Sequence, residues 1–139
     1  MADKLTSQQR SAVMSAVKNK NTTPEIRVRK ALHAMGYRFR LHRKDLPGKP
    51  DIVLPKYKLC IFVHGCFWHQ HTHCSRATIP ASNREFWVEK LTGNIARDEK
   101  NETELKLLGW NVCVIWECET KNTDKLTNEI NRCFYRMPK

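Results

Sequence analysis

The sequence has few acidic residues and no long apolar segment. Its 139 residues hold 14 Asp and Glu against 25 Lys and Arg, for a formal net charge of +11 at pH 7. No apolar run approaches the ~20 residues that cross a bilayer, and the N-terminus lacks the apolar core of a secretion signal. We therefore expect a cytoplasmic protein with no membrane contact. Repeats, low-complexity tracts and obvious linkers are absent too, so the length fits a single globular unit.

The excess of positive charge indicates an anionic partner. A charge of +11 raises the local concentration of a polyanion and speeds encounter with it. Nucleic acid is the leading partner class on this ground. The alternative is that the charge only keeps a small protein soluble.

Hydrophobic periodicity predicts three helices. Thr23 as cap, Pro24 and Glu25 in the first turn and Gly36 as terminator define the first of them. The second runs from residue 83 to 108 with an expected break at Gly93, and the third covers residues 122–136.

Strand patterns lie between and after these helices. Residues 37–42 alternate apolar and basic side chains, whereas 51–54, 59–64 and 110–117 are short, largely apolar runs. The order is helix, three strands, helix, strand, helix, which predicts a mixed α/β sandwich.

The six cysteines divide by location. In a reducing compartment they are not expected to form a disulfide framework. Cys60, Cys113 and Cys133 lie among apolar neighbours and are expected to be small, unligated core residues.

The stretch HGCFWHQHTHC, residues 64–74, is rich in soft metal ligands. Thiolate and imidazole donors at such short spacing favour Zn²⁺. We expect Cys66, His71 and Cys74 as ligands, with Cys118 as the fourth because it follows the end of the last predicted strand. Spacing leaves open whether His73 replaces His71, or whether no metal binds. A complete set of four ligands predicts a structural ion, with no position left for water.

Asp51 follows the turn PGKP and begins a strand. A carboxylate fixed at a sheet edge can bind Mg²⁺, which prefers oxygen donors. An aspartate at such a position also commonly caps the turn.

Several of these segments together resemble the very-short-patch repair (Vsr) family of DNA mismatch endonucleases. The resemblance runs from about Ser11 to Leu126 and rests on SAVMSAVKNKNTTPE, LPGKPDIV, IFVHGCFWHQH, NREFWVEK, NIARD and LGWNVCVIWEC. It implies a restriction-endonuclease-like α/β fold with a structural zinc site. It also implies nicking of one DNA strand on the 5′ side of T in T:G mismatches, which arise by deamination of 5-methylcytosine. The competing hypothesis is a non-catalytic, zinc-stabilised DNA-binding module.

The resemblance assigns roles to individual residues. Asp51 and the main-chain oxygen of Val63 would bind the catalytic Mg²⁺. His69 would be the general base, supported by Glu25 and His64. The alternatives are a zinc-ligating or exposed His69, a His64 that only orients the loop, and a Glu25 that only stabilises the helix dipole.

DNA contacts follow from the same resemblance and from the charge. The adjacent aromatic residues Phe67 and Trp68 would intercalate at the mismatch, joined by Met14 from the N-terminal segment. The alternative for Phe67 and Trp68 is that they cover the zinc site, and the alternative for Met14 is ordinary helix packing. Residues expected to contact phosphates include Lys18, Arg38, Arg40 and Lys49.

The domain organisation and the partners are expectations as well. We expect a DNA-contacting segment over residues 1–20, which can be mobile until a partner binds, and one endonuclease domain over 21–139. Since the lesion is asymmetric, we expect a monomer. The family implies that a repair polymerase and a ligase complete the patch, and that the enzyme associates with the nucleoid when on DNA.

Overall fold

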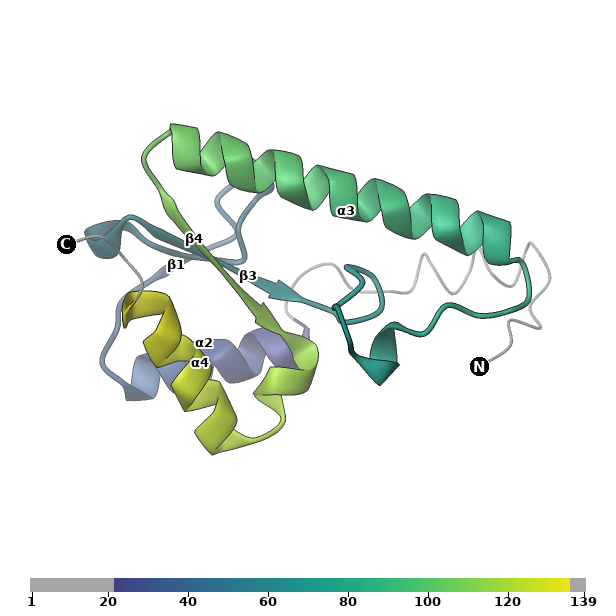
Figure 1. Ribbon diagram of the computed structural model, residues 1–139. Coiled ribbons are helices and arrows are strands. Elements are labelled where there is room, and N and C mark those ends of the chain that lie inside the picture. Colours follow the sequence, from purple (N-terminus) through teal and green to yellow (C-terminus); the bar gives the residue numbers. More distant parts are fainter. Residues whose placement is uncertain (1–21, 136–139) are drawn as a thin grey trace.

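The computed structural model describes residues 22–135, which form a mixed sheet covered by helices on both faces (Figure 1). The α-helices and strands are α2 (Thr23–Ala34), β1 (Arg40–Leu41), β2 (Ile52–Leu54), β3 (Leu59–His64), α3 (Arg84–Leu107), β4 (Asn111–Trp116) and α4 (Thr123–Tyr135). Three short 3-10 helices, η1 (Pro55–Tyr57), η2 (Ser75–Ala77) and η3 (Glu117–Thr120), lie between them. The predicted mixed α/β architecture and its element order are confirmed.

The strand order within the described residues is β1-β2-β3-β4. β1 and β2 are antiparallel, as are β2 and β3, whereas β3 and β4 are parallel. The parallel register sets His64 opposite Trp116 at the carboxyl ends of the two strands. Loops that leave this end of the sheet therefore begin side by side, which is where α/β folds commonly bind ligands.

Alternating side chains of the central strands fill two cores. Leu59 and Ile61 of β3 pack with Ile115 of β4 against α2 and α4. On the opposite face, Cys60 and Val53 pack with Leu105 of α3. Figure 1 shows α3 running along one face while α2 and α4 cover the other. His64 belongs by alternation to the α3 face, so the core that fixes β3 also fixes this histidine.

Two boundary predictions need correction at the helices. The cap of α2 is Thr22, whose hydroxyl accepts a hydrogen bond from the Glu25 N–H, not Thr23. The predicted terminator holds, because Gly36 adopts a positive φ of 88° after the last turn. The predicted break at Gly93 is wrong: α3 runs through it for 24 residues. A helical glycine costs only about 1 kcal/mol, which the burial of Trp87, Leu91 and Leu105 offsets.

The predicted strand at residues 37–42 is reduced to β1, Arg40–Leu41. Leu41 is 41% exposed, although the alternation predicts it to face the core. Among residues 22–135, β1 is an edge strand that pairs only with the short β2, so these residues cover little of its surface.

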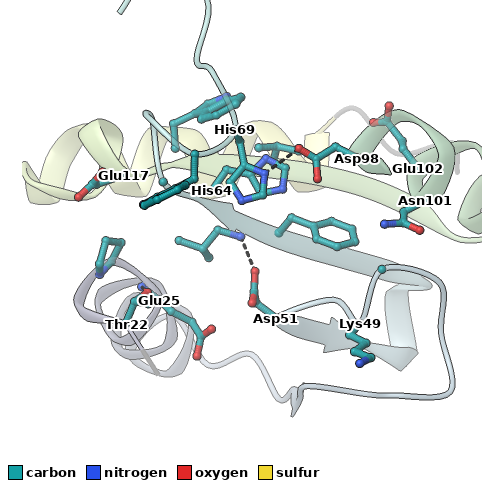
Figure 2. A pocket seen from close by; sticks show the side chains of 18 of the residues that line it. Thr22, Glu25, Lys49, Asp51, His64, His69, Asp98, Asn101, Glu102 and Glu117 are labelled. Atoms are coloured by element: carbon teal, nitrogen blue, oxygen red, sulfur yellow. Dashed lines mark hydrogen bonds and ion pairs between the residues drawn. The ribbon is translucent and has the colours of Figure 1, made fainter. Parts of the chain in front are cut away.

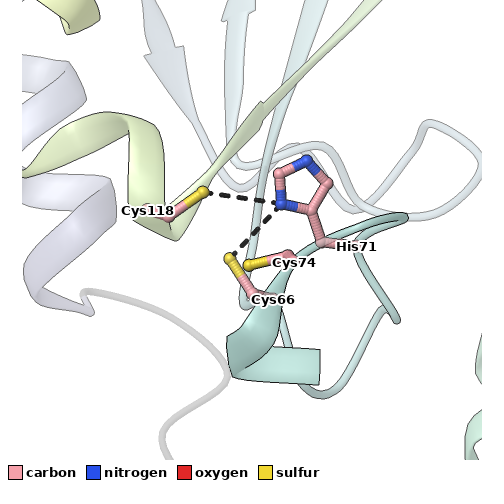
Figure 3. Close-up of side chains that lie close together, drawn as sticks. All are labelled: Cys66, His71, Cys74 and Cys118. Carbon is pink, nitrogen blue, oxygen red and sulfur yellow. Dashed lines mark hydrogen bonds between the residues drawn. The ribbon is translucent and has the colours of Figure 1, made fainter. Parts of the chain in front are cut away.

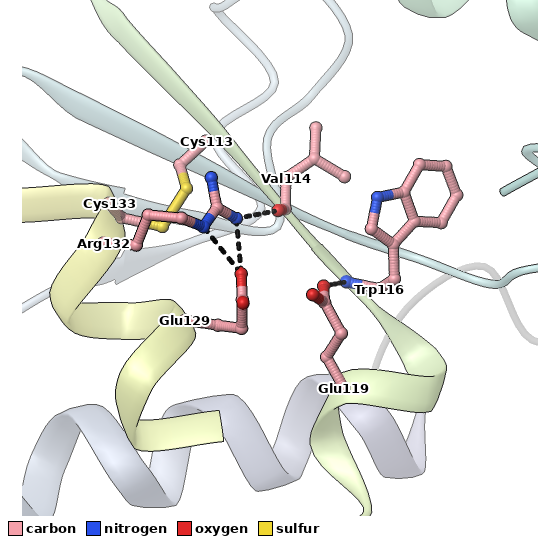
Figure 4. Close-up of a disulfide and its surroundings, with 7 residues drawn as sticks. All are labelled: Cys113, Val114, Trp116, Glu119, Glu129, Arg132 and Cys133. Carbon is pink, nitrogen blue, oxygen red and sulfur yellow. Dashed lines mark hydrogen bonds and ion pairs between the residues drawn. A yellow bond between two sulfur atoms is a disulfide. The ribbon is translucent and has the colours of Figure 1, made fainter. Parts of the chain in front are cut away.

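A disulfide joins Cys113 of β4 to Cys133 of α4 (Figure 4). Both residues are buried, as predicted, but the expectation that they are unpaired is wrong. Their Cα atoms lie 5.6 Å apart because α4 packs on the face to which Cys113 points. A separation of 20 residues gives no local sequence signal for the pair. No helix in the described part of the chain is long and apolar enough to span a membrane.

Candidate active site and metal centre

A cleft of about 1140 Å³ opens at the carboxyl ends of β3 and β4. Its walls come from the start of α2, the loop before β2, the loop after β3 and the middle of α3 (Figure 2). Gly48 lets the loop before β2 pack closely on α3, because a Cβ there would lie 2.9 Å from the Cβ of Asn101. Lys44 and Lys49 also line the cleft.

Asp51 lies in this cleft just before β2. Because β2 runs antiparallel to β3, Asp51 sits beside the end of β3, where its Oδ2 accepts a 2.8 Å hydrogen bond from the Val63 N–H. Burial raises the pKa of Asp51 to about 6, against the opposing effects of this hydrogen bond and of the Arg29 charge. The carbonyl of a strand residue points to the same side as its N–H, so the Val63 oxygen also faces this edge. A half-buried carboxylate and a carbonyl are suitable donors for Mg²⁺.

His69 faces Asp51 from the other side of the cleft, on the loop after β3 (Figure 2). Its Nδ1 lies 2.6 Å from Oδ2 of Asp98 on α3. In the tautomer that carries its hydrogen on Nδ1, this N–H donates a hydrogen bond to the Asp98 carboxylate, and the lone pair of Nε2 stays free. The arrangement therefore holds an oriented imidazole with one free nitrogen in a partly exposed position.

His64 lies beneath His69. The two rings stack with centroids 3.8 Å apart and planes 5° apart. Burial lowers the pKa of His64 to about 3, with a further lowering by the proximity of His69. At neutral pH His64 is therefore uncharged, and it supports His69 without repelling a proton on it.

Glu25 is buried in the first turn of α2 and also lines the cleft. Its carboxylate forms an ion pair with Arg29, and the Nε2 of His42 lies 3.0 Å from Oε2. Glu25, His42 and Asp51 have donor atoms within 4.8 Å of one another. The carboxylate of Glu25 thus fixes two nitrogen groups next to Asp51, which goes beyond stabilising the helix dipole.

The four predicted zinc ligands converge on one point at the other side of the loop (Figure 3). The donor atoms of Cys66, His71, Cys74 and Cys118 all lie within 4.8 Å of one another. The His71 Nδ1 is 3.5 Å from the Cys118 sulfur and 3.7 Å from the Cys66 sulfur. A tetrahedral ion with bonds of about 2.3 Å to sulfur and about 2.0 Å to nitrogen spaces such ligands about 3.5 Å apart.

The donor set fits zinc, and His71 rather than His73 belongs to it. His73 is exposed and lies outside this group. η3 carries Cys118 to the loop, and the Cys66 N–H hydrogen-bonds to Glu117 on the same turn at 3.4 Å.

Phe67 and Trp68 form an aromatic cluster with Trp87 of α3. The ring of Trp87 lies 5.5 Å from Phe67 and 6.0 Å from Trp68, centroid to centroid. The Asn94 side chain also donates a 3.0 Å hydrogen bond to the Trp68 carbonyl. Both residues remain partly exposed and line the cleft. The contacts with Trp87 and Asn94 of α3 therefore fix the positions of both aromatic residues. Shielding of the cysteine cluster alone does not explain these contacts.

The predicted DNA-contacting cations are distributed unevenly. Lys49 lines the cleft, whereas Arg38 and Arg40 are exposed near the β1 edge and do not line it. Met14 and Lys18, with the whole predicted segment 1–20, lie outside the described residues.

Sequence reasoning missed four residues of the site: Asp98, Arg29, His42 and Trp116. Arg29 could have been found, because an i,i+4 pair with Glu25 on a helix is a local signal. Asp98 lies 29 residues from His69, and no spacing rule connects them. His42 directly follows β1, and its N–H donates to the Asp51 carbonyl, whereas Trp116 pairs with His64 at the end of β4. Both positions depend on how the strands pair.

Known proteins resemble this chain along most of its length. The family model described as DNA mismatch endonuclease Vsr matches residues 2–76. The type II nicking enzyme V.NmeAIP of Neisseria meningitidis is 50% identical over 132 residues, covering 95% of this chain and 94% of the relative. The DNA mismatch endonuclease Vsr of Escherichia coli is 42% identical over 129 residues, covering 93% and 82% respectively.

A solved structure shares the fold. The catalytic domain of the homing endonuclease I-Bth0305I superposes with a TM-score of 0.57 at 24% identity. The match covers 83% of this chain and 96% of that domain. The predicted restriction-endonuclease-like arrangement of a mixed sheet flanked by helices is thereby confirmed.

Proposed function

The chain belongs to the Vsr family of DNA mismatch endonucleases, so its chemistry is the hydrolysis of DNA. From that premise we propose that it nicks one strand of duplex DNA on the 5′ side of the T in a T:G mismatch. Such mismatches result from deamination of 5-methylcytosine, and the nick would start a short repair patch that a polymerase and a ligase complete. The observation that carries the proposal is a pair of oriented side chains on opposite sides of the cleft. Asp51 is held by the Val63 N–H, and His69 is held by Asp98.

His69 is the proposed general base. Because Asp98 engages its Nδ1, the Nε2 atom takes the proton from the attacking water. Asp98 stabilises the imidazolium that forms, and the neutral ring of His64 keeps His69 in plane. A base of this kind contributes about 10²- to 10⁴-fold.

Asp51 and the Val63 carbonyl are the proposed ligands of Mg²⁺. When bound there, the ion would stabilise the negative charge that develops on the phosphate oxygens. The Val63 N–H holds the Asp51 carboxylate in place. Glu25 supports this side of the cleft by fixing Arg29 and His42.

Recognition of the mismatch is assigned to Phe67 and Trp68, with Met14 entering from the N-terminal segment. A T:G step costs less to unstack than a normal pair, so an aromatic wedge selects it without reading a base edge. Lys49, together with Lys18, Arg38 and Arg40, would contact phosphates. Since a single nick at an asymmetric lesion needs one active site, the proposal is a monomer.

The cysteine cluster is proposed to hold a structural Zn²⁺ that fixes the loop carrying His69. The fit of the donor distances to a tetrahedral ion supports this assignment. With four protein donors, no coordination position remains for substrate water.

The test uses zinc-loaded protein, Mg²⁺ and duplexes that differ only in one T:G or T:A pair, with both strands end-labelled. We expect one nick beside the mismatched T and none in the T:A duplex. Asp51→Asn should reduce the rate by roughly a thousandfold, the upper end of the range for loss of one charge-stabilising group. Asp45→Asn, an exposed carboxylate in the same loop, is the matched control and should cut normally.

Two results would contradict the proposal. Cutting of both strands in fully paired DNA would make the protein a restriction enzyme on the same fold. Binding without cutting, across several flanking sequences that include methylated ones, would leave a DNA-binding module.

A further inference from the structure

Trp116 occupies the last position of β4, directly opposite His64 in the parallel register. Alternation sends the Trp116 side chain to the α3 face with Val112 and Val114, and all three line the cleft. Its backbone is also fixed, because the Trp116 N–H donates a 2.8 Å hydrogen bond to Oε1 of Glu119 in η3 (Figure 4). The indole therefore sits on a rigid strand end between two sites.

The indole contacts a histidine of each site. The His71 ring stacks on it, with centroids 4.2 Å apart and planes 8° apart. His64 meets it edge to face at 5.3 Å and 73°. His64 in turn stacks on His69 at 3.8 Å. Four rings thus form a continuous row from the cysteine cluster to the candidate base.

Both ends of this row are anchored through Nδ1. His71 points this atom at the cysteine sulfurs, and His69 points it at Asp98. The middle of the row has no such anchor in the hydrogen bonds of the described residues, so the orientation of His64 depends on ring contacts. A planar, rigid side chain is needed at position 116 to satisfy a stacked and an edge-to-face neighbour together.

We propose that Trp116 is a positioning residue that sets the planes of His71 and of the His64–His69 pair, and so couples the geometry of the cysteine-histidine cluster to the base. The catalytic part of this inference rests on the proposed function. Trp116 need not touch DNA or the reacting atoms. Its effect is on where His69 directs Nε2, a geometry in which an error of about 1 Å can cost roughly a hundredfold in rate.

The experiment compares Trp116→Leu, Trp116→Phe and Trp110→Leu in zinc-loaded protein. Trp110 is the matched control, since it is also partly buried and precedes the opposite end of the same strand. Imidazole ring NMR signals, zinc competition with a chromophoric chelator, duplex affinity and single-turnover cleavage are measured for each variant. Urea unfolding checks that the two leucine variants are comparably stable.

For Trp116→Leu we expect shifted ring signals of His64 and His69 and zinc affinity lowered by roughly tenfold, the lower range for loss of a group that orients a metal ligand. Cleavage should fall by roughly tenfold or more while duplex affinity changes little, since the base moves and the DNA surface does not. Trp116→Phe should restore most of both losses, and Trp110→Leu should show neither.

Unchanged histidine signals in Trp116→Leu would overturn the proposal. Equal losses in Trp110→Leu would do the same, because they would reflect general destabilisation. If the unmodified protein fails to cut T:G duplexes, the proposed function fails separately. The ring signals and the zinc competition still decide the role of Trp116 in that case.

Discussion

Two sites share one loop, and neighbouring histidines of that loop belong to different ones. His71 turns its Nδ1 to a compact group of sulfurs, whereas His69 turns its Nδ1 to a carboxylate and leaves the other nitrogen toward an open cleft. The first site has all four donors of a tetrahedron within 4.8 Å. The second has donors spread over the walls of a cleft of about 1140 Å³. A metal held by four protein donors has a structural role, because no coordination position is left for water. Donor groups spread over the walls of a cleft leave room for a substrate.

The largest effect is expected on the closed site. Cys66→Ser removes one buried donor, and structural zinc contributes about 10–16 kcal/mol to folding in small domains, as much as the whole stability of most proteins. We expect loss of zinc and of most folded protein, measured by metal analysis and circular dichroism. Cys60→Ala, at a buried cysteine outside the cluster, should keep both. A folded, metal-free and active Cys66→Ser protein would show that the cysteine cluster is not a structural metal site.

The second effect separates the two neighbouring histidines. His69→Gln should keep zinc and fold but lower the single-turnover cleavage rate by about 10²- to 10⁴-fold, the contribution of a general base. His71→Gln should instead behave like the cysteine variant. The exposed His73 provides the control, and His73→Gln should cut at the normal rate. Zinc loss in His69→Gln would assign this residue to the closed site.

A smaller effect is expected where the cleft meets DNA. Phe67→Ala and Trp68→Ala should each weaken binding to a T:G duplex by about tenfold, because stacking on a base contributes about 1–3 kcal/mol. Binding to the T:A duplex should change less, and this difference is measured by fluorescence anisotropy. Tyr135→Ala, at an aromatic side chain that is 92% exposed on α4, is the control. Equal weakening on both duplexes would remove the wedge role.

The smallest effect on function is expected at the disulfide, which lies on the face of the sheet that α4 covers (Figure 4). Replacing Cys113 and Cys133 together by alanine should lower the free energy of unfolding by about 3 kcal/mol, as for loops of this length. Cleavage below the unfolding transition should stay unchanged. Urea titration and nicking assays measure the two quantities, and a parallel loss of cleavage would show that α4 also controls the cleft.

The sequence alone determined the element order and most of the candidate site. Period-two and helical patterns act locally, so β3, β4 and the helices could be predicted from neighbouring residues. The short spacing of Cys66, His71 and Cys74 likewise predicted a cluster of metal ligands. The family resemblance supplied the expected roles of Asp51 and His69. Only residues 22–135 test these placements, so the expected contribution of Met14 and Lys18 stays a prediction.

Tertiary structure decided which partner each of these residues has. The pairing of His69 with Asp98, of His42 with Glu25 and of Cys113 with Cys133 depends on strand register and on which helix covers which face. The choice of His71 over His73 also required the position of η3, which brings in Cys118. Such contacts join residues far apart in sequence, so no local pattern encodes them. Packing of the two cores selects one register and thereby fixes them together.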